Sequence, residues 1–328
     1  MSSRQASIFG RGAGPQRTLA AAAVLPLLAA LAAGCGAPAP AENDAALAGP
    51  IVVITLSALP VDALGDATWT PALDELAARS WSNSALAPSS SPIPSLGSLL
   101  TGIDPWLHQA YSHRAGPMRE GVPTLPQRLT EAGWSTRAFF PLHHRLHRFG
   151  FFAGFDSVEE SGEDESTRSA LRDAPDASLT WIHLPDPGFP YVDRREQLPR
   201  LPELQAETER IERRWLMPYA DPELDMPEPL LSAAQELYRH QVAWADHRLG
   251  RLIEALRTNP RWERCTLIVT ALHGNELAAR GQVLFAQNLS RPSLEVPLIV
   301  RIPEGAGRDL PDSGAAVSTS RLAATVLD

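Results

Sequence analysis

The run Ile51-Val52-Val53-Ile54-Thr55-Leu56 is the feature that most constrains the fold. It is continuous and largely β-branched, which is typical of a strand buried on both faces of a sheet. Further apolar runs predict strands at residues 135–140, 178–184, 265–271 and 296–302. Helical patterns separate several of these runs. Strands that alternate with helices predict an α/β fold, with a mostly parallel central sheet and helices on both faces.

The clearest helix covers Pro229–Arg257, where apolar residues recur at spacings of three or four. Another begins at Thr70-Pro71, with Thr70 as the expected N-cap, and Val317–Leu327 is also expected to be helical. Residues 157–177 are acidic and are predicted to form an irregular surface excursion. Residues 185–228 are predicted to form a long loop with a short helix around 207–215, and a loop of that length usually shapes a binding face.

Residues 1–34 are predicted to be a lipoprotein signal peptide. They begin with a segment that holds three arginines and no acidic residue. The apolar run from Leu19 to Ala33 follows, and it is short for a membrane span. The run ends in Ala33-Gly34-Cys35, which resembles a bacterial lipobox with Cys35 as the lipidated residue. Residues 35–48 then form a flexible tether and residues 49–328 the folded domain. The chain is therefore expected to be exported and membrane-anchored, at the periplasm or the cell surface; the alternative is an ordinary secretory signal.

The net charge argues against one class of partner, and the cysteine content argues against an internal disulfide. Loss of the three arginines in residues 1–34 takes the formal net charge from −9 to −12, and so acidic a surface argues against nucleic acid. All 29 basic residues are arginine, so the chain has no lysine. Lipidation of Cys35 would leave Cys265 alone, so the exported fold would have no internal disulfide.

Ligands of parallel α/β sheets bind at the carboxyl ends of the strands. Three segments are expected at that edge: Leu56–Asp62, Ala87–Gly102 and Ala271–Glu276. The second is a Ser/Pro loop that leads into a short apolar helix, with Pro94 in its first turn and Gly102 at its end. The start of a helix favours anions, because its free N–H groups point outward.

With these segments on one edge, the chain resembles the sulfatase family of the alkaline-phosphatase superfamily. The likeness runs in the family order from Pro50 to Asp328. It rests on the first strand followed by Asp62-Ala63-Leu64-Gly65, Thr70-Pro71-Ala72-Leu73-Asp74, Pro94-Ser95 with Ser98-Leu99-Leu100-Thr101-Gly102, Gly154-Phe155-Asp156, Asp186-Pro187, Asp246, His273-Gly274 and Val296-Pro297-Leu298-Ile299.

The resemblance implies a hydrolase of sulfate or phosphate esters that uses Ca²⁺ or Mg²⁺ and an activated nucleophile. This chain departs from the family at those positions. Ser57 stands where the family has a metal-binding acid, and Leu272 replaces the acid beside His273. Pro92 stands at the nucleophile position, and Leu96 where an arginine often lies.

These departures predict a catalytically degenerate protein without a metal cofactor, which acts in binding or scaffolding. Its partners would be the membrane, through the lipid on Cys35, and a glycan or another envelope protein. The old pocket would be lined by Ser57, His108 and His143.

Other interpretations of the sequence stay open. The chain could be an active sulfuric or phosphoric ester hydrolase with a rearranged site, in which Ser95 attacks and His273 serves as base. His143 and His147 could share a transition metal, although a polar loop explains them more simply. The chain could also be a fragment, because sulfatases continue into a smaller C-terminal region.

Overall fold

An eight-stranded sheet forms the centre of the computed structural model, which describes residues 49–112, 114, 116–141, 143–221, 223–276, 288–303 and 314–327. The predicted signal peptide and tether, with Cys35, lie outside the described residues. The strand order across the sheet is β10 (Val317–Ser318), β2 (Trp81–Leu86), β9 (Glu295–Arg301), β8 (Thr266–His273), β1 (Ile51–Ala58), β5 (Ser178–Leu184), β3 (Ser135–Phe139) and β4 (Ser157–Glu159).

The sheet is mostly parallel, as the sequence predicts. β1 pairs in parallel with β5 and β8, and β3 pairs in parallel with β5 and β4. β9 pairs antiparallel with β8 and with β2, so it runs against the other strands of this sheet. Val52, Val53 and Ile54 of β1 are fully buried. The continuous apolar run therefore occupies the middle of the sheet, where both faces are covered.

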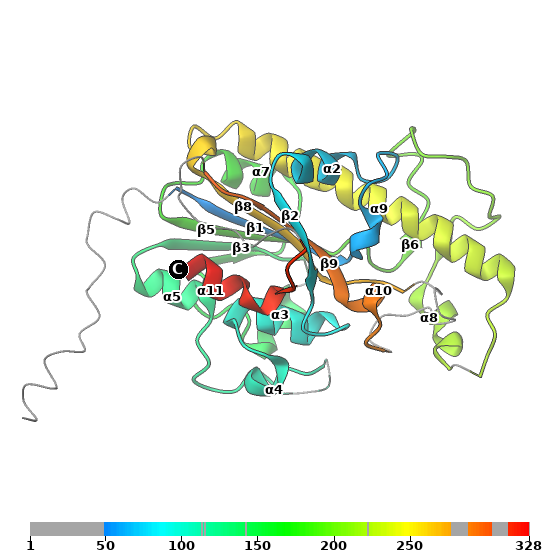
Figure 1. Ribbon diagram of the computed structural model, residues 1–328, viewed down its shortest axis with the longest axis horizontal. Coiled ribbons are helices and arrows are strands. Elements are labelled where there is room, and N and C mark those ends of the chain that lie inside the picture. Colours follow the sequence, from blue (N-terminus) through cyan, green and yellow to red (C-terminus); the bar gives the residue numbers. More distant parts are fainter. Residues whose placement is uncertain are drawn as a thin grey trace, which may run out of the picture. The chain divides into compact units, whose positions relative to one another are not determined.

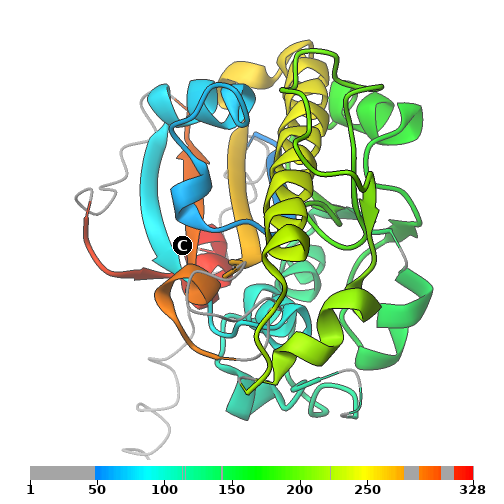
Figure 2. The same cartoon turned by 90° about the vertical axis from the view of Figure 1, so that its right-hand side faces the viewer.

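Helices cover both faces of the sheet (Figures 1 and 2). One face carries α2 (Pro71–Ala78), α7 (Glu165–Arg172) and α9 (Glu228–Arg257), and α9 packs against both of the others. The opposite face carries α3 (Pro92–Thr101), α5 (Leu125–Glu131) and α11 (Leu322–Leu327). The remaining short helices are α4 (Pro105–His108), α6 (His143–Leu146), α8 (Arg213–Leu216) and α10 (Arg291–Leu294).

Three local predictions are wrong. Residues 157–177 are not an irregular excursion, because they contain β4 and α7. Residues 185–228 are not a plain loop, because β6 (Tyr191–Val192) pairs with β7 (Arg210–Ile211), and the helix there is α8. Only Leu322–Leu327 of the predicted C-terminal helix is an α-helix. Val317–Ser318 instead extends the sheet as β10, because it pairs with the edge strand β2.

The start of α2 is capped from another helix rather than by Thr70. The Thr70 hydroxyl donates to the Ala63 carbonyl, so it does not cap α2. The carboxylate of Asp246 on α9 instead accepts the N–H groups of Leu73 at 2.8 Å and Ala72 at 3.1 Å. Two elements far apart in sequence are thereby joined at one buried carboxylate.

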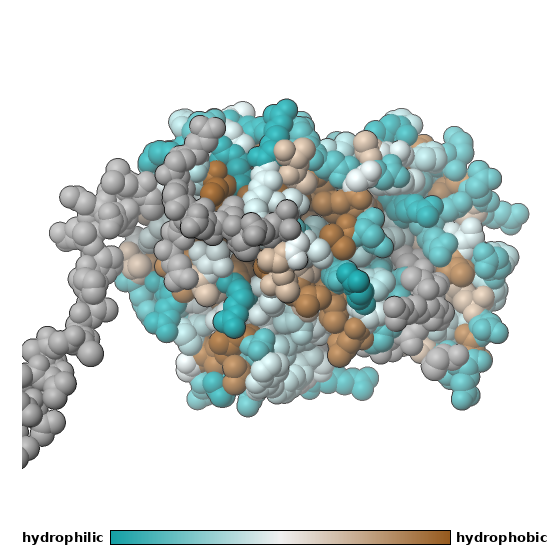
Figure 3. All heavy atoms as spheres, in the orientation of Figure 1, coloured by the Kyte–Doolittle hydropathy of each residue, from teal (hydrophilic) through white to brown (hydrophobic). Residues whose placement is uncertain are grey.

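Hydrophobic residues on the face seen in Figure 3 form patches that are separated by hydrophilic ones. Trp106, in α4, and Tyr111, shortly after it, are among the exposed large apolar side chains, with exposed fractions of 64% and 51%. Apolar side chains scattered in this way are normal for a solvated surface.

The contact between α3 and α4 depends on a glycine. A Cβ at Gly97 would lie 2.7 Å from Cε1 of His108, closer than real Cβ contacts come. Gly97 therefore lets the fully buried His108 ring lie directly against α3. At the end of this helix Gly102 adopts φ 75°, as expected for a glycine that ends a helix.

We expect Gly97→Ala to lower the free energy of unfolding by about 1–3 kcal/mol, because the added methyl overpacks this contact. Alanine normally stabilises a helix relative to glycine. A lower free energy of unfolding would therefore be due to the contact with His108 and not to helix propensity. Gly116→Ala is the control, since none of the described residues lies within 4 Å of a Cβ there. Urea denaturation of both variants checks the expectation, and equal stability of the two would contradict it.

Candidate functional site

The ends of β1, β5 and β8 lie side by side at one edge of the sheet. Ala58 pairs with His273 across β1 and β8, and Leu56 pairs with Leu184 across β1 and β5. α3 packs against β8 and begins at Pro92. The structure therefore brings the ends of β1 and β8 together and packs α3 against β8, as the sequence predicts for a site at this edge.

His183 joins the ends of β1 and β5. Its Nδ1 lies 3.0 Å from Oγ1 of Thr55, and its Nε2 lies 3.4 Å from Oγ of Ser57. The imidazole ring stacks on Phe140, with ring centroids 5.3 Å apart. The Ser57 N–H donates to the Asp186 carbonyl at 3.2 Å. Ser57 is half-buried, and its hydroxyl and N–H both face groups of β5 or the segment after it.

Electrostatics at this edge favour neutral imidazoles. Burial, with smaller contributions from His273 and Arg248, lowers the pKa of His183 to about 4. Burial also lowers the pKa of His273 to about 4. Arg248 on α9 donates to the Asp186 carboxylate at 2.5 Å. The edge thus carries two uncharged histidines and an ion pair between Arg248 and Asp186.

His273 and Leu272 end β8, and both are buried. His273 donates from Nδ1 to the carbonyl of Gly274 at 2.6 Å. Leu272 is apolar and offers no ligand atom. In the part of the chain that the structure describes, no group of three or more His, Cys, Asp or Glu side chains is placed to hold a metal ion.

The Ser/Pro loop forms the first turn of α3, with Pro92 at its first position. Ser95 is fully buried, and its hydroxyl donates to the Ser89 carbonyl at 2.9 Å. Leu96 is buried beside it. The Ser95 hydroxyl therefore closes the turn before the helix.

His108 is enclosed between α3 and α4. The Ala110 N–H donates to its Nδ1 at 3.1 Å, so the ring proton is on Nε2 and can donate to the Pro94 carbonyl at 3.2 Å. The Ser98 hydroxyl lies 3.1 Å from the same nitrogen. Burial lowers the pKa of His108. His143 begins α6, and its side chain lies outside the described residues.

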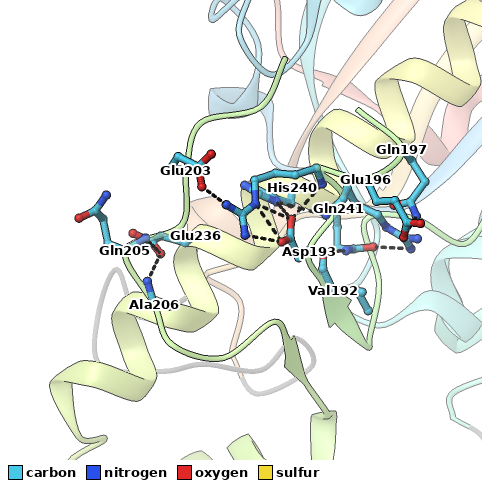
Figure 4. Close-up of polar contacts among 12 residues, drawn as sticks. Val192, Asp193, Glu196, Gln197, Glu203, Gln205, Ala206, Glu236, His240 and Gln241 are labelled. Atoms are coloured by element: carbon cyan, nitrogen blue, oxygen red, sulfur yellow. Dashed lines mark hydrogen bonds and ion pairs between the residues drawn. The ribbon is translucent and has the colours of Figure 1, made fainter. Parts of the chain in front are cut away.

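The segment after β6 is held on α9 by the polar contacts in Figure 4. The Asp193 carboxylate accepts from Arg195 at 2.7 Å and lies 3.1 Å from Nδ1 of His240. Gln241 donates to the Val192 carbonyl at 2.7 Å. The carboxylate of Glu236 accepts two backbone N–H groups, from Gln205 and Ala206. These contacts join the segment after β6 to three side chains of α9.

A cavity of about 520 Å³ lies at the same edge, and the sequence analysis did not identify it. Its walls come from the segment after β1, from α9 and from the segment after β8. The lining residues are Pro60, Asp62, Ala63, Asp66, Trp69, Gln235, Tyr238, Arg239, Val242, Asn275 and Glu276. The placement of Asp62 and Glu276 in segments that follow β1 and β8 was the one sequence signal for it.

Comparisons with known proteins bear on the fold. The sulfatase family model matches residues 199–328. The chain has a sulfatase-like fold. No curated protein matches the sequence. The family resemblance seen in the sequence is confirmed for this domain and fold.

Several solved structures share the sulfatase fold. A protein described as a sulfatase from Bacteroides thetaiotaomicron has a TM-score of 0.66 at 16% identity, over 85% of this chain and 70% of that one. The phosphonate monoester hydrolase of Agrobacterium radiobacter has a TM-score of 0.57 at 17% identity, over 84% and 72%. The C-terminal periplasmic domain of EcEptC from Escherichia coli, in complex with zinc, has a TM-score of 0.60 at 16% identity, over 85% and 81%.

We expect the sulfatase-fold chain to lose stability as the pH falls from 6.5 to 4. Native His183 stays neutral down to about pH 4, whereas the unfolded chain takes up this proton near pH 6.5. The unfolded state therefore binds more protons in this range, and the residue's share of the loss is about 3 kcal/mol. In urea denaturation measured between pH 6.5 and 4, His183→Gln should lack this part of the loss of unfolding free energy.

His147→Gln is the matched control, because His147 is exposed. It should leave the pH dependence of the unfolding free energy as in the wild type. If the unfolding free energies of the wild type and of His183→Gln changed equally with pH, His183 would not be a buried neutral imidazole.

Proposed function

We propose that this sulfatase-fold chain is an exported binding or scaffolding protein that has lost metal-dependent ester hydrolysis. The observation that carries the proposal is the chemistry of the two strand ends. Ser57, next to the last residue of β1, carries a hydroxyl beside His183, and Leu272, next to the last residue of β8, has an apolar side chain. Neither position supplies the carboxylate that hydrolysis by this family would require.

The residues at the edge do not fit Ca²⁺ or Mg²⁺. Both ions take hard oxygen ligands, above all carboxylates. The Asp186 carboxylate is paired with Arg248, whose positive charge would repel a divalent cation. Nδ1 of His273 donates a hydrogen bond to the Gly274 carbonyl, so this nitrogen is not free to bind a metal.

The nucleophile position supports the same proposal. Pro92 has no group that can attack, and it occupies the first position of α3 without backbone strain. The Ser95 hydroxyl is buried and bonded to the Ser89 carbonyl, so a rearranged serine hydrolase would have to break this contact before attack. An active hydrolase that uses Ser95 and His273 is the alternative, and the hydrolysis assay below distinguishes it from the proposal.

The proposed location and partners rest on the amino-acid sequence. A lipid on Cys35 would hold the chain at the membrane, and the tether at residues 35–48 would carry the domain into the periplasm or to the cell surface. None of the helices in the described ranges is long and apolar enough to cross a bilayer. A glycan or another envelope protein is the proposed ligand, and the acidic surface argues against nucleic acid.

We expect calorimetric titration with Ca²⁺ or Mg²⁺ to show no stoichiometric binding to the purified chain. Aryl sulfate and aryl phosphate esters should be hydrolysed no faster than in buffer, with or without added metal. His273→Ala and Ser95→Ala should behave as the wild type does in both assays, because neither residue is proposed to act chemically.

Stoichiometric metal binding would overturn the proposal. So would turnover of either ester that disappears in Ser95→Ala or His273→Ala while the variant keeps its folded circular-dichroism spectrum. That second result would establish the alternative, an ester hydrolase with a rearranged site.

A further inference from the structure

Another cavity, of about 360 Å³, lies where α3, α5 and α11 pack against one another. These helices cover the face of the sheet opposite α9 (Figures 1 and 2). The cavity shares no lining residue with the one beside the strand ends, and all the residues that line it belong to the described ranges. Its volume lies within the range of ligand pockets in proteins, which is roughly 300–1,000 Å³.

Apolar side chains form much of the wall of this cavity. Val122 comes from the segment before α5, Leu125 from α5 and Ala323 from α11. Leu125 and Ala323 are otherwise buried in the core. A Cβ at Gly102 would lie 3.3 Å from Cβ of Ala323, so α11 contacts the end of α3 closely. The apolar wall is therefore built by the packing of the fold and is in place before a ligand binds.

Hydrogen bonds hold the segment between α4 and α5, which forms another part of the wall. The Arg119 N–H donates to the His108 carbonyl at 2.9 Å. The Thr124 N–H donates to Oε1 of Gln127 at 2.8 Å, and the Thr124 hydroxyl donates to the Ala153 carbonyl at 2.7 Å. These bonds fix the backbone on both sides of Val122 and the start of α5.

The charge of the cavity wall is positive. The side chains of Arg119 and Arg128 line it, and no carboxylate side chain does. Both arginines are exposed, and neither guanidinium forms an ion pair with any residue that the structure describes. Arg168 and Arg195, by contrast, each pair with carboxylates. In a chain whose formal net charge is −9, two unpaired cations beside an apolar wall are complementary to an anion that carries an apolar group.

We propose that this cavity binds a small organic carboxylate with a short apolar body. The carboxylate accepts charge-assisted hydrogen bonds from Arg119 and Arg128, because guanidinium groups match carboxylates in geometry and charge. The apolar body lies against Val122 and Leu125, where it loses contact with water. This ligand is additional to the glycan or envelope protein of the proposed function, and the inference does not depend on the loss of hydrolysis.

Three probes that share one apolar tail test the proposal by calorimetry on the purified chain. They are hexanoate, hexan-1-ol and hexylammonium. Hexanoate should bind at one site about tenfold more tightly than hexan-1-ol, as expected for hydrogen bonds between charged groups. Hexylammonium should bind more weakly than either, because the guanidinium groups repel it. Arg119→Gln and Arg128→Gln should each weaken hexanoate binding several-fold and leave the affinity for hexan-1-ol unchanged.

Arg145→Gln is the matched control, because this exposed arginine on α6 is not part of the cavity wall. It should leave hexanoate binding unchanged, whereas Val122→Ser should weaken the binding of both hexanoate and hexan-1-ol. The proposal is overturned if hexanoate binds no more tightly than hexan-1-ol, or if Arg119→Gln and Arg128→Gln bind hexanoate as Arg145→Gln does. Ester turnover would refute the loss of hydrolysis without changing these affinities, so the two failures are distinguishable.

Discussion

The position of β1 between β5 and β8 is the constraint on which the rest of the structure depends. Its backbone is paired on both sides, and its apolar residues are buried on both faces. A shift of one residue would turn every side chain of β1 to the opposite face. The strand therefore fixes where Ser57 lies, and with it which groups meet at the carboxyl edge of the sheet.

At that edge, hydrogen bonds and burial stabilise neutral imidazoles and one ion pair. His183 bridges Thr55 and Ser57 as a neutral ring, and Arg248 pairs with Asp186. Buried polar groups are stable only when they are paired, and these pairings use groups that a metal or a substrate would otherwise contact. The neighbouring cavity lies beyond the ends of β1 and β8, and Ser57 and Leu272 are not among its lining residues.

Patterns of neighbouring residues predicted the helices and strands that depend mainly on those residues. The β-branched run predicted β1, the spacing of apolar residues predicted α9, and Gly102 predicted the end of α3. Contacts between distant residues were beyond such patterns: Asp246 caps α2, and the acidic stretch after Ser157 forms β4 because it pairs with β3. The cavity was missed for the same reason, since Trp69, Tyr238 and Glu276 come from three separate segments. Only the strand-end positions could be read from the sequence.

We propose that the strand ends do not hold a divalent metal. Crystals grown with Mn²⁺, a hard cation that is visible by anomalous scattering, test this most directly. The account predicts no anomalous peak among Ser57, His183 and His273. A peak within coordination distance of Ser57 or His273 would contradict it, because it would show that this edge still supplies metal ligands.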